Sequence, residues 1–200
     1  MASKDRILRL KEETRCNILE AALQIVKEEG WQALSMRKIA DMIEYTAPII
    51  YEYFSNKDAI LLELTRQGYL KLSRELKEAR DRHHKPEKQL EDMWLTYWNF
   101  AFANKELYQG MFGVTTNCSC ELVNSLIEVD APYDLFSEVI GKIMNVEDLE
   151  SDVICTKYYT FWSVVHGLVS INLLSRGSSD EINRQVLKDA ISSIIRTMTT

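Results

Sequence analysis

The segment from residue 31 to residue 58 constrains the fold of this chain most strongly. It contains two short runs of apolar residues at helical spacing, separated by a turn at Glu44-Tyr45. Ser35 is a favoured N-cap for the first helix, and Pro48 is tolerated in the first turn of the second, where early N–H groups have no helical partner. Two helices joined by so tight a turn are typical of proteins that place one helix in the DNA major groove.

Helical periodicity continues along the rest of the chain. We expect the first helix over about 13–29, the fourth over about 57–80 and the last two over 150–175 and 180–198. Only 7 Gly and 3 Pro are present, which leaves little material for a turn-rich β fold. The sequence therefore predicts an all-α fold of about nine helices.

The charge of the chain is distributed unevenly, which bears on DNA binding. The formal net charge is −6. Residues 1–57 carry nine basic and nine acidic side chains, so residues 58–200 hold the whole excess of acid. Because phosphate neutralisation supplies most nonspecific DNA affinity, we expect such binding to be weak.

The sequence favours a cytoplasmic protein that has no membrane contact and is not an enzyme. It has no apolar run long enough to span a bilayer, and its N-terminus lacks the apolar core of a signal peptide. It contains no HExxH, GxSxG or Gly-rich phosphate motif, and we expect no cofactor and no metal. Cys118 and Cys120 match neither redox nor common zinc spacings, so we interpret all four cysteines as structural or incidental thiols.

Residues 15–64 resemble the DNA-binding domain of the TetR family of transcriptional regulators. The resemblance rests on ILEAALQIVKEEGWQAL (18–34), SMRKIADMI (35–43) and YTAPIIYEYFSNKDAILLEL (45–64). Its most specific part is Tyr51, Tyr53 and Phe54 followed by Lys57 and Asp58. The remaining residues resemble a family C-terminal domain in helical plan, with a Trp-x3-His-Gly signature at 162–167 typical of one subgroup.

The resemblance implies two domains and a regulatory function. Residues 1–56 would form a three-helix helix-turn-helix domain, and residues 57–200 a larger helical domain for ligand binding and dimerisation. The implied function is a ligand-responsive regulator of transcription. We expect a repressor that a small apolar or aromatic effector releases from a palindromic operator in double-stranded DNA. The alternative is a helical small-molecule-binding or adaptor protein with weak or lost DNA binding.

The expected DNA contacts combine the recognition helix with flanking positions that match the family. They are Ser35, Arg37, Tyr45, Thr46, Ala47, Pro48, Ile49, Tyr51 and Lys57. The tip of this helix offers no Arg, Lys, Asn or Gln, so bidentate contacts to base edges are scarce. We expect contacts to thymine methyl groups, one hydroxyl contact and a dependence on DNA shape.

The turn departs from the family pattern, which usually has Gly where this chain has Glu44. A left-handed residue there would cost about 1 kcal/mol more for Glu than for Gly. Either the turn bends differently or this strain is tolerated.

Aromatic residues of the C-terminal region are candidates for an effector cavity, although aromatic residues on helices more often form a core. The candidates are Trp94, Trp98, Phe102, Tyr108, Phe112, Phe136, Trp162 and His166. The last two helices are candidates for a homodimer interface, since residues 153–174 are apolar on nearly every face. The predicted interface residues are Val165, Val169, Val186, Ile191 and Ile194.

Overall fold

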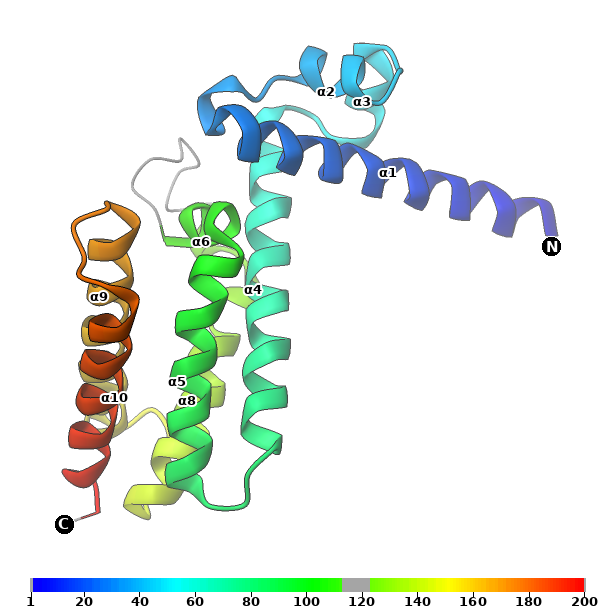
Figure 1. Ribbon diagram of the computed structural model, residues 1–200. Coiled ribbons are helices and arrows are strands. Elements are labelled where there is room, and N and C mark those ends of the chain that lie inside the picture. The colour runs from blue at the N-terminus through cyan, green and yellow to red at the C-terminus, as the bar shows by residue number, and fades with distance from the viewer. Residues whose placement is uncertain (1, 113–122, 200) are drawn as a thin grey trace. The chain divides into compact units, whose positions relative to one another are not determined.

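The computed structural model describes residues 2–112 and 123–199. Nine α-helices and two 3-10 helices are present in these ranges, and none of the described residues forms a strand. The all-α prediction is confirmed. The elements are α1 (Ala2–Glu29), η1 (Trp31–Ala33), α2 (Met36–Met42), α3 (Ala47–Tyr53), α4 (Lys57–Asp81), α5 (Pro86–Ala103), α6 (Lys105–Phe112), η2 (Ile127–Val129), α8 (Ala131–Met144), α9 (Asp152–Leu173) and α10 (Asp180–Arg196) (Figure 1).

The chain divides into two compact units. Unit 1 comprises residues 1–68 and 106–126, and unit 2 comprises residues 69–105 and 127–200. The expected domain boundary after residue 56 lies inside unit 1. The physical reason is that Ile60, Leu61 and Leu64, in the first half of α4, are buried in the same core as α1, α2 and α3. α4 is one unbroken helix that contributes residues to both units.

α1 is longer than its apolar pattern indicates. Its buried stripe includes Ile18, Ala22 and Ile25, as the periodicity predicts, but the helix begins at Ala2 instead of near residue 13. Residues 4–13 of this extension are exposed to solvent. The helix ends at Gly30, whose φ of 84° is a conformation that residues with a Cβ rarely adopt.

α6 packs into unit 1 although it comes from the middle of the sequence. Leu107 belongs to the same apolar core as α1 to α3. A Cβ on Gly110 would lie 3.3 Å from the Trp31 ring, so glycine allows α6 to approach η1 closely. The helix-turn-helix region is therefore supported by a segment that lies more than forty residues further along the chain.

Unit 2 is a layered helical bundle. α5 contacts α8, α9 and α10, and α9 and α10 run side by side (Figure 1). The second half of α4 adds Tyr69, Leu72 and Leu76 to the buried residues of this unit. Burial raises the pKa of Tyr69 to about 12, with a further contribution from the nearby Asp130 carboxylate.

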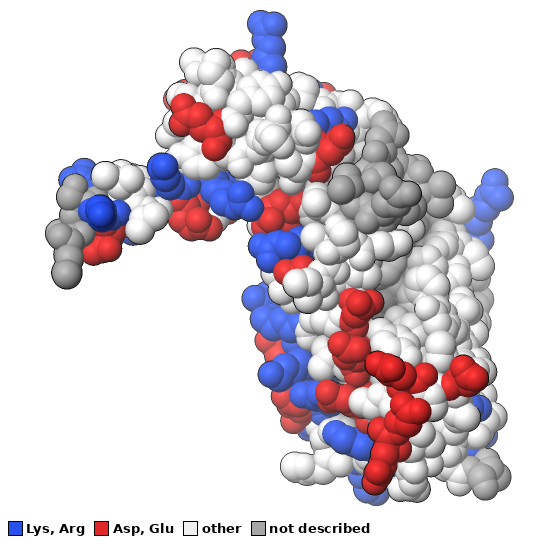
Figure 2. Space-filling model, turned by 180° about the vertical axis from the view of Figure 1, so that it is seen from behind, with Lys and Arg blue, Asp and Glu red and all other residues white. Residues whose placement is uncertain are grey.

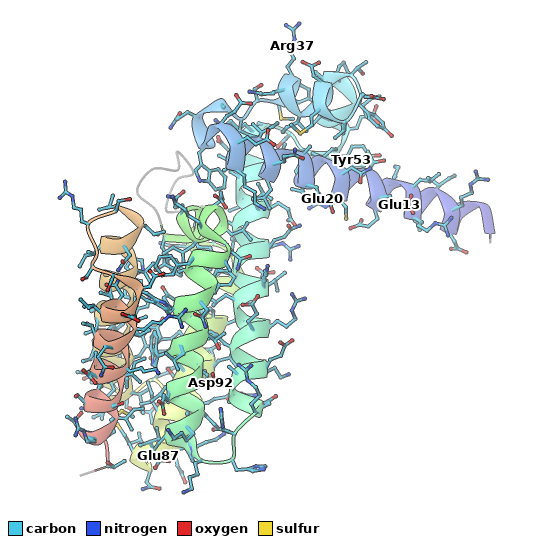
Figure 3. All side chains as sticks on the ribbon, viewed as in Figure 1. Glu13, Glu20, Arg37, Tyr53, Glu87 and Asp92 are labelled. Carbon is cyan, nitrogen blue, oxygen red and sulfur yellow. The ribbon has the colours of Figure 1, made fainter. Side chains whose placement is uncertain are left out.

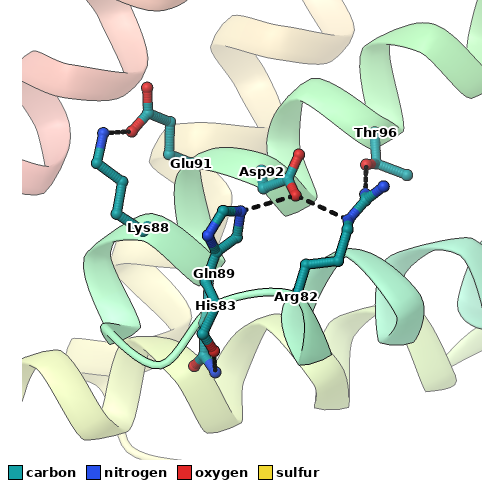
Figure 4. Close-up of polar contacts among 7 residues, drawn as sticks. All are labelled: Arg82, His83, Lys88, Gln89, Glu91, Asp92 and Thr96. Carbon is teal, nitrogen blue, oxygen red and sulfur yellow. Dashed lines mark hydrogen bonds and ion pairs between the residues drawn. The ribbon is translucent and has the colours of Figure 1, made fainter.

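Polar contacts fix the turn between α4 and α5 (Figure 4). The Asp92 carboxylate lies 3.1 Å from both Arg82 Nε and His83 Nε2, and Gln89 Nε2 donates to the His83 carbonyl oxygen at 2.8 Å. Pro86 stands in the first turn of α5, where it displaces no helical hydrogen bond. This histidine and its neighbours thus serve a structural role at the turn.

Charge differs between the two units. In Figure 2 acidic side chains gather on one face of unit 2, whereas unit 1 shows Lys and Arg interspersed with Asp and Glu. Within the described residues no helix is both long and apolar enough to cross a membrane. Cys16 and Cys155 are free thiols, and Cys118 and Cys120 lie outside the described residues.

Candidate DNA-binding surface and aromatic sites

Glu44 lies in the turn between α2 and α3 and adopts one of the two conformations considered above. Its φ of 58° is left-handed, a conformation that glycine adopts without strain and that costs energy for a residue with a Cβ. Tyr45 N donates to the Ala40 carbonyl oxygen at 2.9 Å and closes the turn. Ser35 caps α2 as predicted, because its Oγ accepts a hydrogen bond from Lys38 N at 3.2 Å. The strain at Glu44 is therefore tolerated within a fully bonded turn.

α3 separates its buried and exposed residues cleanly. Ile50 is fully buried and Phe54, directly after the helix, is 4% exposed, so both anchor the helix to the core. Tyr51 is 54% exposed, and Thr46 and Pro48 are exposed as well. The residues expected to contact DNA thus lie on the solvent side of α3, with Ala47 and Ile49 half-buried at its edge.

The two cations of α2 behave differently. Arg37 is exposed and points away from the body of unit 1 (Figure 3). Lys38 forms an ion pair with Glu29 at the end of α1. Arg37 is consequently the basic side chain beside α3 that is open to a phosphate group, since Lys38 is already engaged.

Lys57 has a protein partner at the expected phosphate position. Its Nζ donates to the Trp31 carbonyl oxygen at 3.2 Å, and the side chain is half-buried. Asn56 caps α4 through a bond from Ala59 N to its Oδ1 at 2.8 Å. A phosphate contact by Lys57 remains a prediction, and it would require the ammonium group to share or leave the Trp31 carbonyl.

The eight aromatic candidates for an effector cavity are divided between the two units. Six of them lie in unit 2, whereas Tyr108 and Phe112 of α6 belong to unit 1, where their ring centroids are 4.9 Å apart. The six in unit 2 fall into three groups with different environments. These groups are a buried stack, a polar cluster and a surface groove.

The buried stack contains Trp94 and Phe136. Their ring centroids are 3.9 Å apart with 20° between the planes, and Phe161 stacks on Trp94 at 5.4 Å. Trp94 is fully buried and Phe136 is 1% exposed. Both rings are covered by other rings, and the lining of an effector cavity by these two residues stays a prediction. They form the centre of the unit 2 core.

The polar cluster joins α5 and α9 through Tyr97, Trp162 and His166. Trp162 Nε1 donates to the Tyr97 hydroxyl oxygen at 3.1 Å, and this oxygen lies 3.3 Å from His166 Nδ1. Trp162 stacks on the His166 ring at 4.8 Å. Burial lowers the pKa of His166, which favours a neutral imidazole whose Nδ1 can accept a hydrogen bond from the Tyr97 hydroxyl. Sequence patterns did not single out Tyr97, whose one signal is its position between Trp94 and Trp98.

The surface groove lies between α5, α9 and α10 and contains Trp98 and Phe102. Their ring centroids are 4.7 Å apart on successive turns of α5. Its remaining lining residues are polar: Asn99, Asn172, Asp180 and Arg184. The cavity has a volume of about 230 Å³. The aromatic spacing predicted the apolar wall, but the charged residues come from α10, about eighty residues further along the chain.

The predicted dimer residues also divide by burial. Val165, Val169 and Ile191 are fully buried within unit 2, so the prediction that they face a second subunit is wrong. Helical periodicity identified an apolar face but not which of two faces looks inward. Val186 is 46% exposed and Ile194 is half-buried. Large exposed apolar side chains on these helices or at their ends include Val164, Ile171, Leu174 and Ile182.

Comparison with known proteins agrees with the geometry of unit 1. Residues 18–64 match the family model described as "Bacterial regulatory proteins, tetR family". No curated protein matches the chain. The matched residues extend from the buried stripe of α1, through α2 and α3, into α4.

Solved structures share the fold over nearly the whole chain. A protein of unknown function from Rhodococcus sp. RHA1 has a TM-score of 0.77 at 19% identity, covering 93% of this chain and 95% of its own. The TetR family transcriptional regulator PfmR from Thermus thermophilus has a TM-score of 0.65 at 19% identity. The match covers 90% of this chain and 97% of PfmR. The transcriptional regulator FadR from Bacillus subtilis, in complex with stearoyl-CoA, has a TM-score of 0.69 at 14% identity. The match covers 92% of this chain and 97% of FadR.

The fold and the exposed face of α3 define a helix-turn-helix DNA-binding protein with a helical second unit. The family match identifies residues 18–64 as a DNA-binding domain of the TetR family. Among the described residues, no group of three or more His, Cys, Asp or Glu side chains is placed to hold a metal ion.

Proposed function

We propose that the protein is a ligand-responsive repressor that binds a palindromic operator as a homodimer. This proposal rests on the exposure of four side chains on and beside α3: Arg37, Thr46, Pro48 and Tyr51. A helix with an uncluttered N-terminal end can approach base edges, while the flanking arginine and tyrosine meet the phosphate backbone. The family resemblance favours a protein that represses transcription until a ligand releases it from DNA.

Dimerisation would use the exposed apolar face of the last two helices. Ile171 of α9, its C-cap residue Leu174, and Ile182 and Val186 of α10 are between 46% and 69% exposed. Exposed apolar side chains gathered on two neighbouring helices favour burial against a second copy around a two-fold axis. Two recognition helices would then contact half-sites about one DNA turn, roughly 34–36 Å, apart.

Coupling would pass through α4, which runs without a break from Lys57 to Asp81 and contributes to both units. An effector bound in unit 2 would favour one position of this helix. Because α4 begins directly after the recognition helix, its position would set the spacing of the two recognition helices in the dimer. The effector would lower operator affinity by its differential affinity for the two states.

The test of DNA binding is a fluorescence-anisotropy titration with DNA from upstream of the protein's own gene. We expect Tyr51→Ala and Tyr51→Phe to weaken binding by about the same factor, 5–10-fold, since both remove the hydroxyl group that would contact phosphate. Thermal unfolding monitored by circular dichroism serves as the control for folding. Unchanged affinity in both variants would contradict a phosphate contact at Tyr51.

One observation favours the alternative of an adaptor with weak DNA binding. Lys38 and Lys57 are both engaged by protein groups, and Glu44 in the turn and Glu52 in α3 are exposed. Unpaired acidic groups at a DNA-facing surface oppose binding, because each repels the phosphate backbone. If the wild-type protein shows no salt-dependent affinity for any upstream DNA, this alternative replaces the repressor.

A further inference from the structure

The surface groove of unit 2 has two chemically different walls. One wall is aromatic and consists of Trp98 and Phe102 on successive turns of α5. The opposite wall is charged and consists of Asp180 and Arg184 on successive turns of α10. Phe102 is 41% exposed, so part of its ring is open to a ligand, whereas Trp98 is 7% exposed and is held in place by its surroundings. An aromatic wall of this kind favours a planar ring that stacks in offset or edge-on geometry.

The two charged residues have no protein partners in the described part of the chain. Asp180 and Arg184 are both exposed and form no ion pair with any residue there. Residues four apart on a helix lie on one face, with Cβ atoms roughly 5–6 Å apart. The groove therefore presents a carboxylate and a guanidinium group side by side. A ligand that satisfies both must carry a cation and an anion close together.

A buried polar network supports the floor of the groove. Asn172 Oδ1 accepts from Asn183 Nδ2 at 2.6 Å, and Asn172 Nδ2 donates to the Leu168 carbonyl oxygen at 2.8 Å. Asn183 is only 4% exposed and also donates to the Ser178 carbonyl oxygen at 3.0 Å. A Cβ on Gly177 would lie 2.0 Å from Asn172 Oδ1, so glycine leaves the room that this side chain occupies. The amide at the floor is thus fixed before any ligand arrives.

We propose that this groove binds a free aromatic α-amino acid. The ring would stack on Phe102, which packs against Trp98, the carboxylate would pair with Arg184, and the ammonium group would pair with Asp180. An α-amino acid carries both charges on one carbon, which matches two charged side chains on adjacent helical turns. The groove volume of about 230 Å³ suits a ligand of this size.

The groove lies wholly in unit 2, so this ligand is also a candidate for the effector. That second statement rests on the proposed function, whereas the binding itself does not. Calorimetry with the full chain and no DNA therefore tests the groove separately. A failure of ligand binding leaves the DNA-binding proposal intact, and a failure of DNA binding leaves the groove intact.

The experiment compares L-phenylalanine with three fragments by isothermal titration calorimetry. The fragments are 3-phenylpropanoate, which lacks the amine, phenethylamine, which lacks the carboxylate, and L-alanine, which lacks the ring. We expect L-phenylalanine to bind at least about tenfold more tightly than either aromatic fragment, because each fragment loses one charge-assisted contact. L-Alanine should give no heat of binding at about 1 mM.

Two exposed substitutions identify the charged partners. Arg184→Gln should weaken L-phenylalanine and 3-phenylpropanoate about fivefold or more and leave phenethylamine unchanged. Asp180→Asn should weaken L-phenylalanine and phenethylamine and leave 3-phenylpropanoate unchanged. Lys188→Gln, one turn further along α10 and outside the groove, is the matched control and should change nothing. Absence of heat with L-phenylalanine, or equal affinity in all variants, would overturn the proposal.

Discussion

The DNA-facing surface of unit 1 and the aromatic region of unit 2 are built in opposite ways. The first comes from one continuous stretch, Ser35 to Lys57, in which a capped helix, a closed turn and a second helix follow one another. The second is assembled from α5, α8, α9 and α10, whose residues meet only after the helices pack. Local geometry sets the first surface, and tertiary packing decides the function of each residue in the second.

α5 shows this difference within a single helix. Trp94 and Trp98 are one turn apart, yet Trp94 is covered by two rings and Trp98 lines a groove. The neighbouring helix decides whether an aromatic side chain stabilises the fold or is available to a ligand.

Trp94→Ala should lower the free energy of unfolding by about 3–5 kcal/mol, because it leaves a cavity at the centre of the stack. Phe102→Ala, on the same helix, should lower it by about 1 kcal/mol or less, since that ring is already 41% exposed. Urea unfolding monitored by circular dichroism measures both values. Equal losses would mean that Trp94 and Phe102 are not in different environments.

Arg37→Ala should weaken DNA binding by about 5-fold at low salt and by a similar factor on all DNA sequences, because a phosphate contact carries no sequence information. The slope of log affinity against log salt should fall by about 0.9, the value for one neutralised phosphate. Lys142→Ala, an exposed cation of unit 2, is the control and should change neither quantity. An unchanged slope for Arg37→Ala would remove this arginine from the DNA-binding surface.

Glu44→Gly should raise the free energy of unfolding by about 1 kcal/mol, since the φ of 58° is strained for a residue with a Cβ. Asn145→Gly offers a matched comparison in unit 2, because Asn145 caps α8 with a φ of 54°. Asn tolerates this conformation better than Glu, so its replacement should change the stability by only a few tenths of a kcal/mol. Thermal unfolding of both variants would show the difference, and a destabilised Glu44→Gly would mean that the Glu44 side chain has a stabilising role.

The smallest predicted effect concerns pH. Burial lowers the pKa of His166 from its ordinary value near 6.5, so the unfolded chain binds the proton more readily than the folded one. The contribution of neutral His166 to stability is therefore complete above about pH 6.5 and is lost as the pH falls through and below that value. His166→Gln should flatten this part of the stability profile measured by urea unfolding. A profile identical to that of the wild type would exclude His166 as its source.

Much of unit 1 could be predicted from the sequence because its signals are short-range. The cap at Ser35, the anchors Ile50 and Phe54 and the exposure of Tyr51 follow from helical periodicity and side-chain chemistry. The partner of Lys57 could not be predicted, because the Trp31 carbonyl reaches it only through tertiary packing. The left-handed conformation at Glu44 was one of two open alternatives, since a strained residue persists only where surrounding bonds enforce it.

In unit 2 the sequence predicted helices and apolar faces but not which faces meet. Val165 and Val169 were expected at a subunit interface, yet they are buried in the core of their own unit. The aromatic candidates were expected around one cavity, yet packing distributes them among a core, a polar cluster and a groove. Asp180 and Arg184 carried no signal before the structure placed them opposite Trp98 and Phe102. Periodicity identifies a face of a helix, and only the fold identifies its neighbour.

The most direct test of the DNA-binding account is selection of bound sites from random double-stranded DNA, followed by sequencing. The tip of α3 offers Thr46, Ala47, Pro48 and Ile49 and no side chain for a bidentate base contact. We therefore expect an inverted repeat with half-sites about one DNA turn, roughly 10 base pairs, apart, with thymines opposite the tip and little discrimination elsewhere. A motif dominated by invariant G·C pairs at the positions that meet residues 46–49 would contradict this account.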